Sequence, residues 1–187
     1  TMLPGVRWRG MALALIATHL LGCKAAPAAP ARLGLRLAPS TLGVSLSLQQ
    51  YLSIERQGRI DSLDAALEVD AERLDLVGLA LGQRMLALHF DGRSLQSWRH
   101  PLVPELLRGE DVLEDLQLTL WPLDVIESAL PSGWSISETG RRRVLRQLDE
   151  PIMVIEYSGE PRWNGRIELT NLRYQYRLTI QSVSSTP

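Results

Sequence analysis

Cysteine and phenylalanine each occur once in this chain of 187 residues, as Cys23 and Phe90. A single cysteine excludes a disulfide within the chain, so the fold has to be stabilised by an apolar core. It also means that Cys23 needs an explanation of its own. With one phenylalanine, that core must be mainly aliphatic, and the sequence is rich in leucine.

Histidine is also scarce, and only His89 and His100 follow Cys23. They do not have the spacing of metal ligands, and the chain has no G-x-S-x-G, P-loop or G-x-G-x-x-G motif. The sequence therefore predicts no catalytic residues, no metal site and no cofactor, and we expect a protein that is not an enzyme. We expect His89 at the surface, on the polar side of a strand, and Glu114 and Asp115 on a solvated helical face.

A large excess of positive charge is absent too. After removal of the first 22 residues, which include Arg7 and Arg9, 18 basic residues remain against 21 acidic ones, a net charge of −3. This balance argues against a nucleic-acid partner, which requires a clustered basic face. We interpret the one run of positive charge, at 141–143, as a solvated loop rather than a phosphate site.

The N-terminal residues have the layout of an export signal. Residues 4–10 contain two arginines and no acid, and an apolar run of 11 residues follows at 11–21. That run is too short for a bilayer, which needs about 20 residues. Its end, Leu20-Leu21-Gly22-Cys23, resembles the lipobox of bacterial lipoproteins.

This resemblance implies that residues 1–22 are a signal peptide and that the Cys23 thiol is acylated. Lys24 at the next position implies sorting to the outer membrane, with the protein anchored on its periplasmic face. The alternative is that Cys23 is an ordinary buried thiol in a short apolar helix. In the lipoprotein interpretation, residues 23–42 are the lipidated cysteine and an Ala/Pro-rich tether, and residues 43–187 form one domain.

Apolar residues alternate with polar ones in several segments of that domain, which predicts antiparallel strands. The alternation covers residues 44–55, 63–69, 74–76, 86–90, 167–169 and 174–180, while 152–157 is apolar on both faces. Between them, Leu113, Leu116 and Leu120 form a helical stripe, with Glu110 and Asp111 in its first turn. Pro122 ends that helix and can serve as the first residue of a second.

Strands, a helical insert and strands again predict an α+β fold, mainly antiparallel β. Several segments in this order resemble the outer-membrane lipoprotein receptor LolB. They are the lipobox, Leu79-Ala-Leu-Gly82, Trp121-Pro-Leu-Asp124 leading into Ala129-Leu-Pro131, and the final pair of strands. The resemblance implies a LolA/LolB-like fold, an open, unclosed β-barrel with a helical lid over an apolar cavity for acyl chains. The chain is also similar to a family of uncharacterised bacterial lipoproteins often encoded beside fatty-acid-type or aryl-polyene synthesis genes.

One element of the receptor transfers by position. Leu79 and Leu81 occupy the place of its membrane-insertion loop, although Ala80 stands where the receptor has a proline. The alternative is that both leucines are strand residues that face the core.

The candidates for the acyl cavity are the apolar residues of the strand faces and of the helix. Such residues could equally fill an ordinary core, since periodicity does not distinguish a filled barrel from a hollow one. The candidates are Leu46, Leu48, Leu86, Leu88, Leu116, Leu120 and Trp121.

The leading hypothesis is a monomeric lipoprotein that binds acyl chains or acylated cargo and transfers it to the outer membrane. Its partners would be membrane lipid, through the anchor, an acylated lipid or lipoprotein cargo, and a LolA-like periplasmic carrier. A non-transporting scaffold of an envelope synthesis or export complex is the alternative, and a periplasmic hydrolase is a weaker third.

Cys23→Ser is expected to release the protein from membranes and to abolish its labelling with palmitate, because serine lacks the thiol that is acylated. Without acyl chains no lasting anchor remains. Membrane fractionation and radiolabelled palmitate measure both effects. Labelling that continues in the variant would refute the assignment.

Overall fold

The computed structural model describes residues 32–103 and 107–184. Cys23 and the predicted signal peptide lie outside the described residues. Among those that are described, no helix has the length and apolar character needed to cross a membrane.

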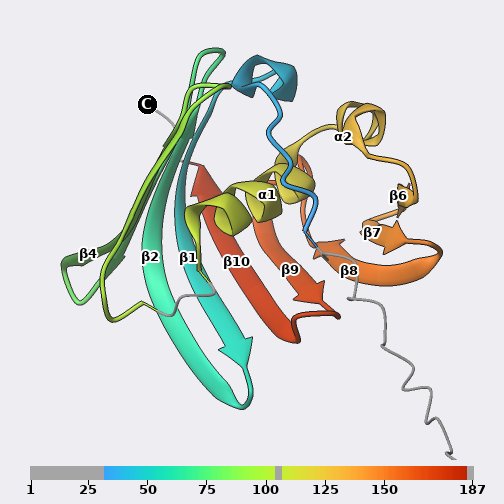
Figure 1. Ribbon diagram of the computed structural model, residues 1–187. Helices are drawn as coiled ribbons and strands as arrows, with labels where there is room; N and C mark the ends of the chain where they lie inside the picture. Colours follow the sequence, from blue (N-terminus) through green and yellow to red (C-terminus); the bar gives the residue numbers. More distant parts are fainter. Residues whose placement is uncertain (1–31, 104–106, 185–187) are drawn as a thin grey trace, which may run out of the picture.

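Ten antiparallel strands form one curved sheet in the order β5-β4-β3-β2-β1-β10-β9-β8-β7-β6 (Figure 1). Pairing of β1 with β10 joins the two halves of the sheet, whereas β5 and β6 lie at opposite edges and do not pair. The barrel is therefore open, which confirms the predicted fold class. The strands are β1 (Leu46–Arg56), β2 (Arg59–Val69), β3 (Leu74–Ala80), β4 (Gln83–Phe90), β5 (Leu95–Arg99), β6 (Trp134–Thr139), β7 (Arg142–Gln147), β8 (Glu150–Tyr157), β9 (Gly165–Asn171) and β10 (Tyr176–Ser184).

The alternation in the sequence sets which side chains face the concave side of the sheet. Leu48 pairs with Leu67, which pairs with Leu76, which pairs with Leu88, and all four are buried. Directly paired residues of antiparallel strands point to the same face, so these leucines form one row across four strands. The predicted strands are confirmed, while the prediction named none of β5, β6 and β7.

Two helices connect the edge strands β5 and β6. Helix α1 (Gly109–Leu120) lies in the concave face of the sheet, and α2 (Leu123–Ala129) follows it (Figure 1). Leu113, Leu116 and Leu120 are buried, as the helical stripe predicts. Pro122 was expected as the first residue of α2 but is its N-cap, and the helix begins one position later, at Leu123.

The chain between residues 32 and 42 runs along α1 and packs into the domain. Gln117, which is fully buried, accepts a hydrogen bond from the Leu37 amide (2.9 Å) and donates one to the Leu37 carbonyl (2.8 Å). Leu35, Leu37 and Leu42 are buried in the core, and a 3-10 helix, η1 (Pro39–Leu42), ends the segment. The packed domain therefore includes the last residues of the predicted tether, which was expected to extend to residue 42.

The prediction of a solvated loop at 141–143 is wrong for Arg143, whereas Arg141 is exposed in the β6–β7 turn and Arg142 is exposed at the start of β7. Arg143 lies in β7 and is 0% exposed. Its guanidinium donates to the carbonyls of Leu118 (2.6 Å) and Trp121 (3.0 Å) at the end of α1, and it pairs with the Glu138 carboxylate at 2.6 Å. The carbonyls at a helix C-terminus have no partner within the helix and carry partial negative charge, which makes this burial of a cation favourable.

Candidate functional site

An apolar pocket lies between α1 and the concave face of the first half of the sheet. The centre of a water molecule can reach about 60 Å³ of it. Its walls are formed mainly by side chains of β1, β10 and α1, with one residue each from β2, β3 and β4. The lining residues are Arg32, Gln50, Leu52, Ile54, Leu63, Leu76, Leu86, Leu107, Asp111, Val112, Asp115, Leu116, Tyr176, Leu178 and Ile180.

Two of the seven cavity candidates from the sequence, Leu86 and Leu116, line this pocket. The others are buried in the core and do not line it: Leu46, Leu48, Leu88, Leu120 and Trp121. Trp121, for example, donates a hydrogen bond from its indole to Thr41 at 2.9 Å. The end of α1 and residues 33–42 cover that part of the sheet. Leu120 also lines a second, wider and more polar depression, together with Leu42 and Tyr157.

The residues that line the rest of the pocket are not among the seven candidates. Leu52 and Ile54 continue the alternation of Leu46 and Leu48 along β1, and Leu178 and Ile180 pair with them on β10. The same alternation that predicts the strand could have identified them. What it does not predict is where α1 crosses the sheet, and this crossing decides which part of the apolar face stays uncovered.

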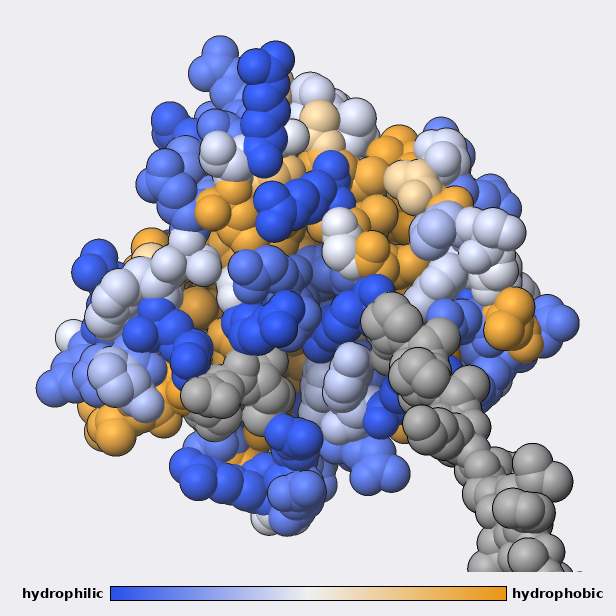
Figure 2. Space-filling view, viewed as in Figure 1, coloured by the Kyte–Doolittle hydropathy of each residue, from blue (hydrophilic) through white to orange (hydrophobic). Residues whose placement is uncertain are grey.

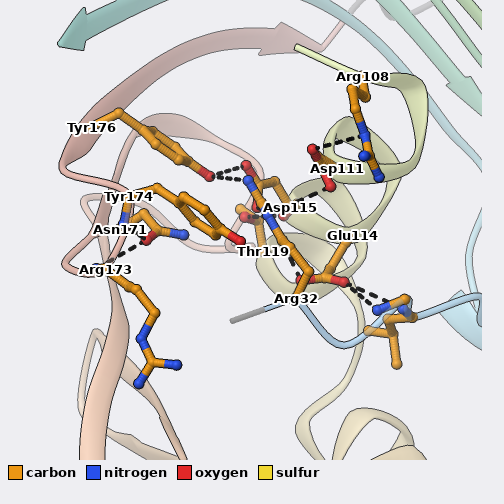
Figure 3. Close-up of polar contacts among 12 residues, drawn as sticks. Arg32, Arg108, Asp111, Glu114, Asp115, Thr119, Asn171, Arg173, Tyr174 and Tyr176 are labelled. Atoms are coloured by element: carbon orange, nitrogen blue, oxygen red, sulfur yellow. Dashed lines mark hydrogen bonds and ion pairs between the residues drawn. The ribbon is translucent and has the colours of Figure 1, made fainter. Parts of the chain in front are cut away.

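A cluster of charged side chains borders one side of the pocket (Figure 3). The Arg32 guanidinium donates to Asp115 Oδ1 at 2.6 Å and to the Tyr176 hydroxyl at 3.0 Å, while that hydroxyl donates to Asp115 Oδ2 at 2.6 Å. Glu114 accepts from the Gly34 amide at 2.7 Å. Through these contacts, residues 32–34 are held against both α1 and β10.

The predicted solvated face at Glu114 and Asp115 is therefore wrong. The Glu114 side chain is 2% exposed and that of Asp115 is 12% exposed. Burial raises the pKa of both carboxyls above their ordinary values, although Arg32 acts in the opposite direction. Three carboxylates, those of Asp111, Glu114 and Asp115, approach this one guanidinium within 3.8 Å.

Exposed apolar side chains gather at the end of the sheet where the β1–β2 and β3–β4 hairpins turn. Leu81 is fully exposed in the β3–β4 turn with a φ of 51°, and Leu79 is 41% exposed. Ile60, at the β1–β2 turn, and Leu102, after β5, are also exposed. We call Ile60, Leu81 and Leu102 the apolar rim. Figure 2 shows apolar surface at the lower left, at this end of the sheet.

This exposure excludes the alternative in which Leu79 and Leu81 face the core. The β1–β2 turn beside Ile60 is polar, with Arg56, Gln57 and Arg59, and the turns at the opposite end of the same strands are polar as well. Asp70 and Asp91 each accept two backbone amides there, which closes the β2–β3 and β4–β5 turns. The apolar rim is thus a property of one end of the half-barrel.

His89 lies at the surface, as predicted, and its Nδ1 is 2.6 Å from Asp75 Oδ1. In the part of the chain that the structure describes, no three His, Cys, Asp or Glu side chains are placed to hold a metal ion.

Residues 47–184, from β1 to the end of β10, match the family described as "Protein of unknown function (DUF3261)". The chain belongs to this family. No protein of curated function matches it.

A solved structure, that of a DUF1329 family protein from Desulfovibrio piger, is similar to this DUF3261 protein at 12% sequence identity. The similarity covers 82% of this chain and 89% of that one, with a TM-score of 0.27. A score this low supports no argument about fold or function.

In this DUF3261 protein, Asp115→Asn is expected to weaken the decrease of stability with rising pH. A carboxyl whose pKa is raised by folding holds its proton more tightly in the folded chain. The free energy of unfolding therefore falls as pH rises from the ordinary pKa, about 4, to the raised one. One group contributes at most about 1.4 kcal/mol per pH unit in that window. Urea unfolding between about pH 4 and about pH 7 measures the slope.

Glu110→Gln is the matched control, because this side chain is 50% exposed on the same helix. It keeps the buried carboxylates and should keep the slope of the unmodified chain. Equal slopes for Asp115→Asn and the unmodified chain would contradict the prediction.

Proposed function

We propose that this protein is an outer-membrane lipoprotein that binds an acyl chain in the pocket under α1 and transfers it to the membrane. The pocket is the observation that carries the proposal. Aliphatic side chains of three paired strands form its walls, among them Leu52, Leu63 and Ile180. Each methylene removed from water into such surroundings contributes about 0.8 kcal/mol, so a hydrocarbon chain is the ligand class that these walls favour.

The size of the pocket favours a single chain over the three chains of a mature lipoprotein. About 60 Å³ open to water centres corresponds to a handful of water positions. A methylene takes up about as much room as a water molecule, about 30 Å³, so this space holds a segment of one acyl chain, and the rest of the chain would extend out of it. The bulkier cargo of a general lipoprotein receptor does not fit. This points to a specialised relative of LolB.

The position of the apolar rim supports delivery to a bilayer. Ile54 and Leu63, which line the pocket, belong to the hairpin whose turn is next to Ile60. A chain that leaves past them reaches the end of the half-barrel where Leu81 projects. Exposed leucines at a turn can enter the interfacial region of a membrane, and transfer would then proceed toward the more favourable apolar environment without energy input.

The anchor at Cys23 completes this proposal. It would hold the protein at the periplasmic face of the outer membrane, where a soluble LolA-like carrier could supply the acylated ligand. No chemical step is required of the protein, so binding and release by themselves account for the activity.

Leu52→Trp is expected to reduce acyl binding by at least about tenfold, because the indole would occupy the pocket. Tenfold in affinity corresponds to about 1.4 kcal/mol. The full chain with Cys23→Ser is purified without detergent, co-purifying lipid is identified by mass spectrometry, and affinity is measured with a fluorescent fatty acid. Ser53→Trp, the outward-facing neighbour on β1, serves as the control and should bind normally.

Lipid-free protein that binds no fatty acid before any pocket substitution would refute the proposal. A stable protein partner recovered from such a preparation would instead favour the scaffold.

Leu81→Glu is expected to slow the transfer of a fluorescent fatty acid from the protein to vesicles, while acyl binding stays unchanged. A carboxylate in the rim opposes insertion into lipid, and Leu81 makes no contribution to the core because it is fully exposed. Ala71→Glu, in the exposed β2–β3 turn at the opposite end, is the matched control. Equal transfer rates for the two variants would contradict a role for the rim.

A further inference from the structure

The pocket has one polar group in the middle of its apolar wall. Gln50 faces the concave side of β1, is 4% exposed and lines the pocket. Its amide nitrogen donates to the Ser182 hydroxyl at 3.0 Å. The amide oxygen is buried and has no hydrogen-bond partner among the described residues.

The residues beside Gln50 are small, which leaves room at this amide. Gln50 pairs with Ser182 on one side and with Ala65 on the other, and Ala65 pairs with Gly78. These residues form one inward-facing row, which continues to Leu86 beyond Gly78, and the direct neighbours of Gln50 in this row have short side chains. Leucines form the rows on both sides of it, for example Leu48 with Leu67 and Leu52 with Leu63.

Buried polar atoms without a partner are rare in folded proteins, because the lost interaction with water is not replaced. In an apolar pocket, a single polar group of this kind selects ligands that can pair with it. We propose that the acyl chain bound in this pocket carries a hydroxyl group that hydrogen-bonds to Gln50. This inference rests on the proposed function and adds to it the chemical class of the ligand.

A hydroxyl fits the site because it both donates and accepts a hydrogen bond. It can pair with the free atom of the amide whichever of the two amide atoms contacts Ser182. An unsubstituted hydrocarbon chain leaves that atom unpaired, so the site discriminates against it.

The test compares hexadecanoic acid with its monohydroxy isomers, each with the hydroxyl at a different carbon. Each competes with a fluorescent fatty acid for the full chain carrying Cys23→Ser. At least one isomer is expected to bind about threefold to tenfold more tightly than hexadecanoic acid, the range of one net hydrogen bond. Methyl esters of the same acids distinguish the source: a preference that persists in the esters indicates a chain esterified in a larger lipid, and one confined to the acids indicates a free hydroxy acid.

Gln50→Leu is expected to remove the preference and to bind hexadecanoic acid at least as tightly as before. Gln49→Leu, the same substitution at the exposed neighbour on β1, should keep the preference. Equal affinity for all isomers before any change at Gln50 would overturn the inference and leave acyl binding intact, and this measurement does not depend on how well the variant folds. A preference that survives in folded Gln50→Leu would also overturn it. Absence of all fatty-acid binding would remove the proposed function as well.

Discussion

The open edge of the sheet is the constraint on which the rest of the structure depends. Ten strands curve around one apolar face, but β5 and β6 do not meet. The face therefore has to be covered by other parts of the chain, because exposed leucine rows would be unfavourable in water. Helix α1 and residues 33–42 provide that cover. They cover it incompletely, and the apolar pocket is one place that they leave open.

Burying α1 brings polar groups into the interior, and several of them pair with groups distant in sequence. Gln117 pairs with the backbone of Leu37, and Arg143 with the carbonyls at the end of the helix. Arg32 pairs with Asp115 and Tyr176. Such contacts are directional, so they define the position and rotation of the helix. The leucines around it would tolerate several positions and rotations.

The periodic parts of the fold were predictable from the sequence, and the contacts of charged groups were not. Alternation along β1 and the stripe at Leu113, Leu116 and Leu120 identify a strand and a helix, because each pattern reflects one buried face. Glu114 and Arg143 were placed in solvent, because a sequence does not show the partner that makes a buried charge tolerable. The pocket residues were missed for a similar reason: Leu48 and Leu52 have the same local pattern and differ only in what lies above them.

Docking of residues 32–42 onto α1 would shorten the tether to a membrane if Cys23 carries the proposed acyl anchor. Eight residues lie between Cys23 and Arg32, instead of the nineteen between Cys23 and Gly43. A fully extended chain spans at most about 3.5 Å per residue, so an acyl anchor at Cys23 confines Arg32 to within about 30 Å of the bilayer surface. That distance is comparable to the size of a small domain. The domain would therefore stay within about one domain diameter of the membrane. It could bring its apolar rim to the lipid by rotation, without a larger translation.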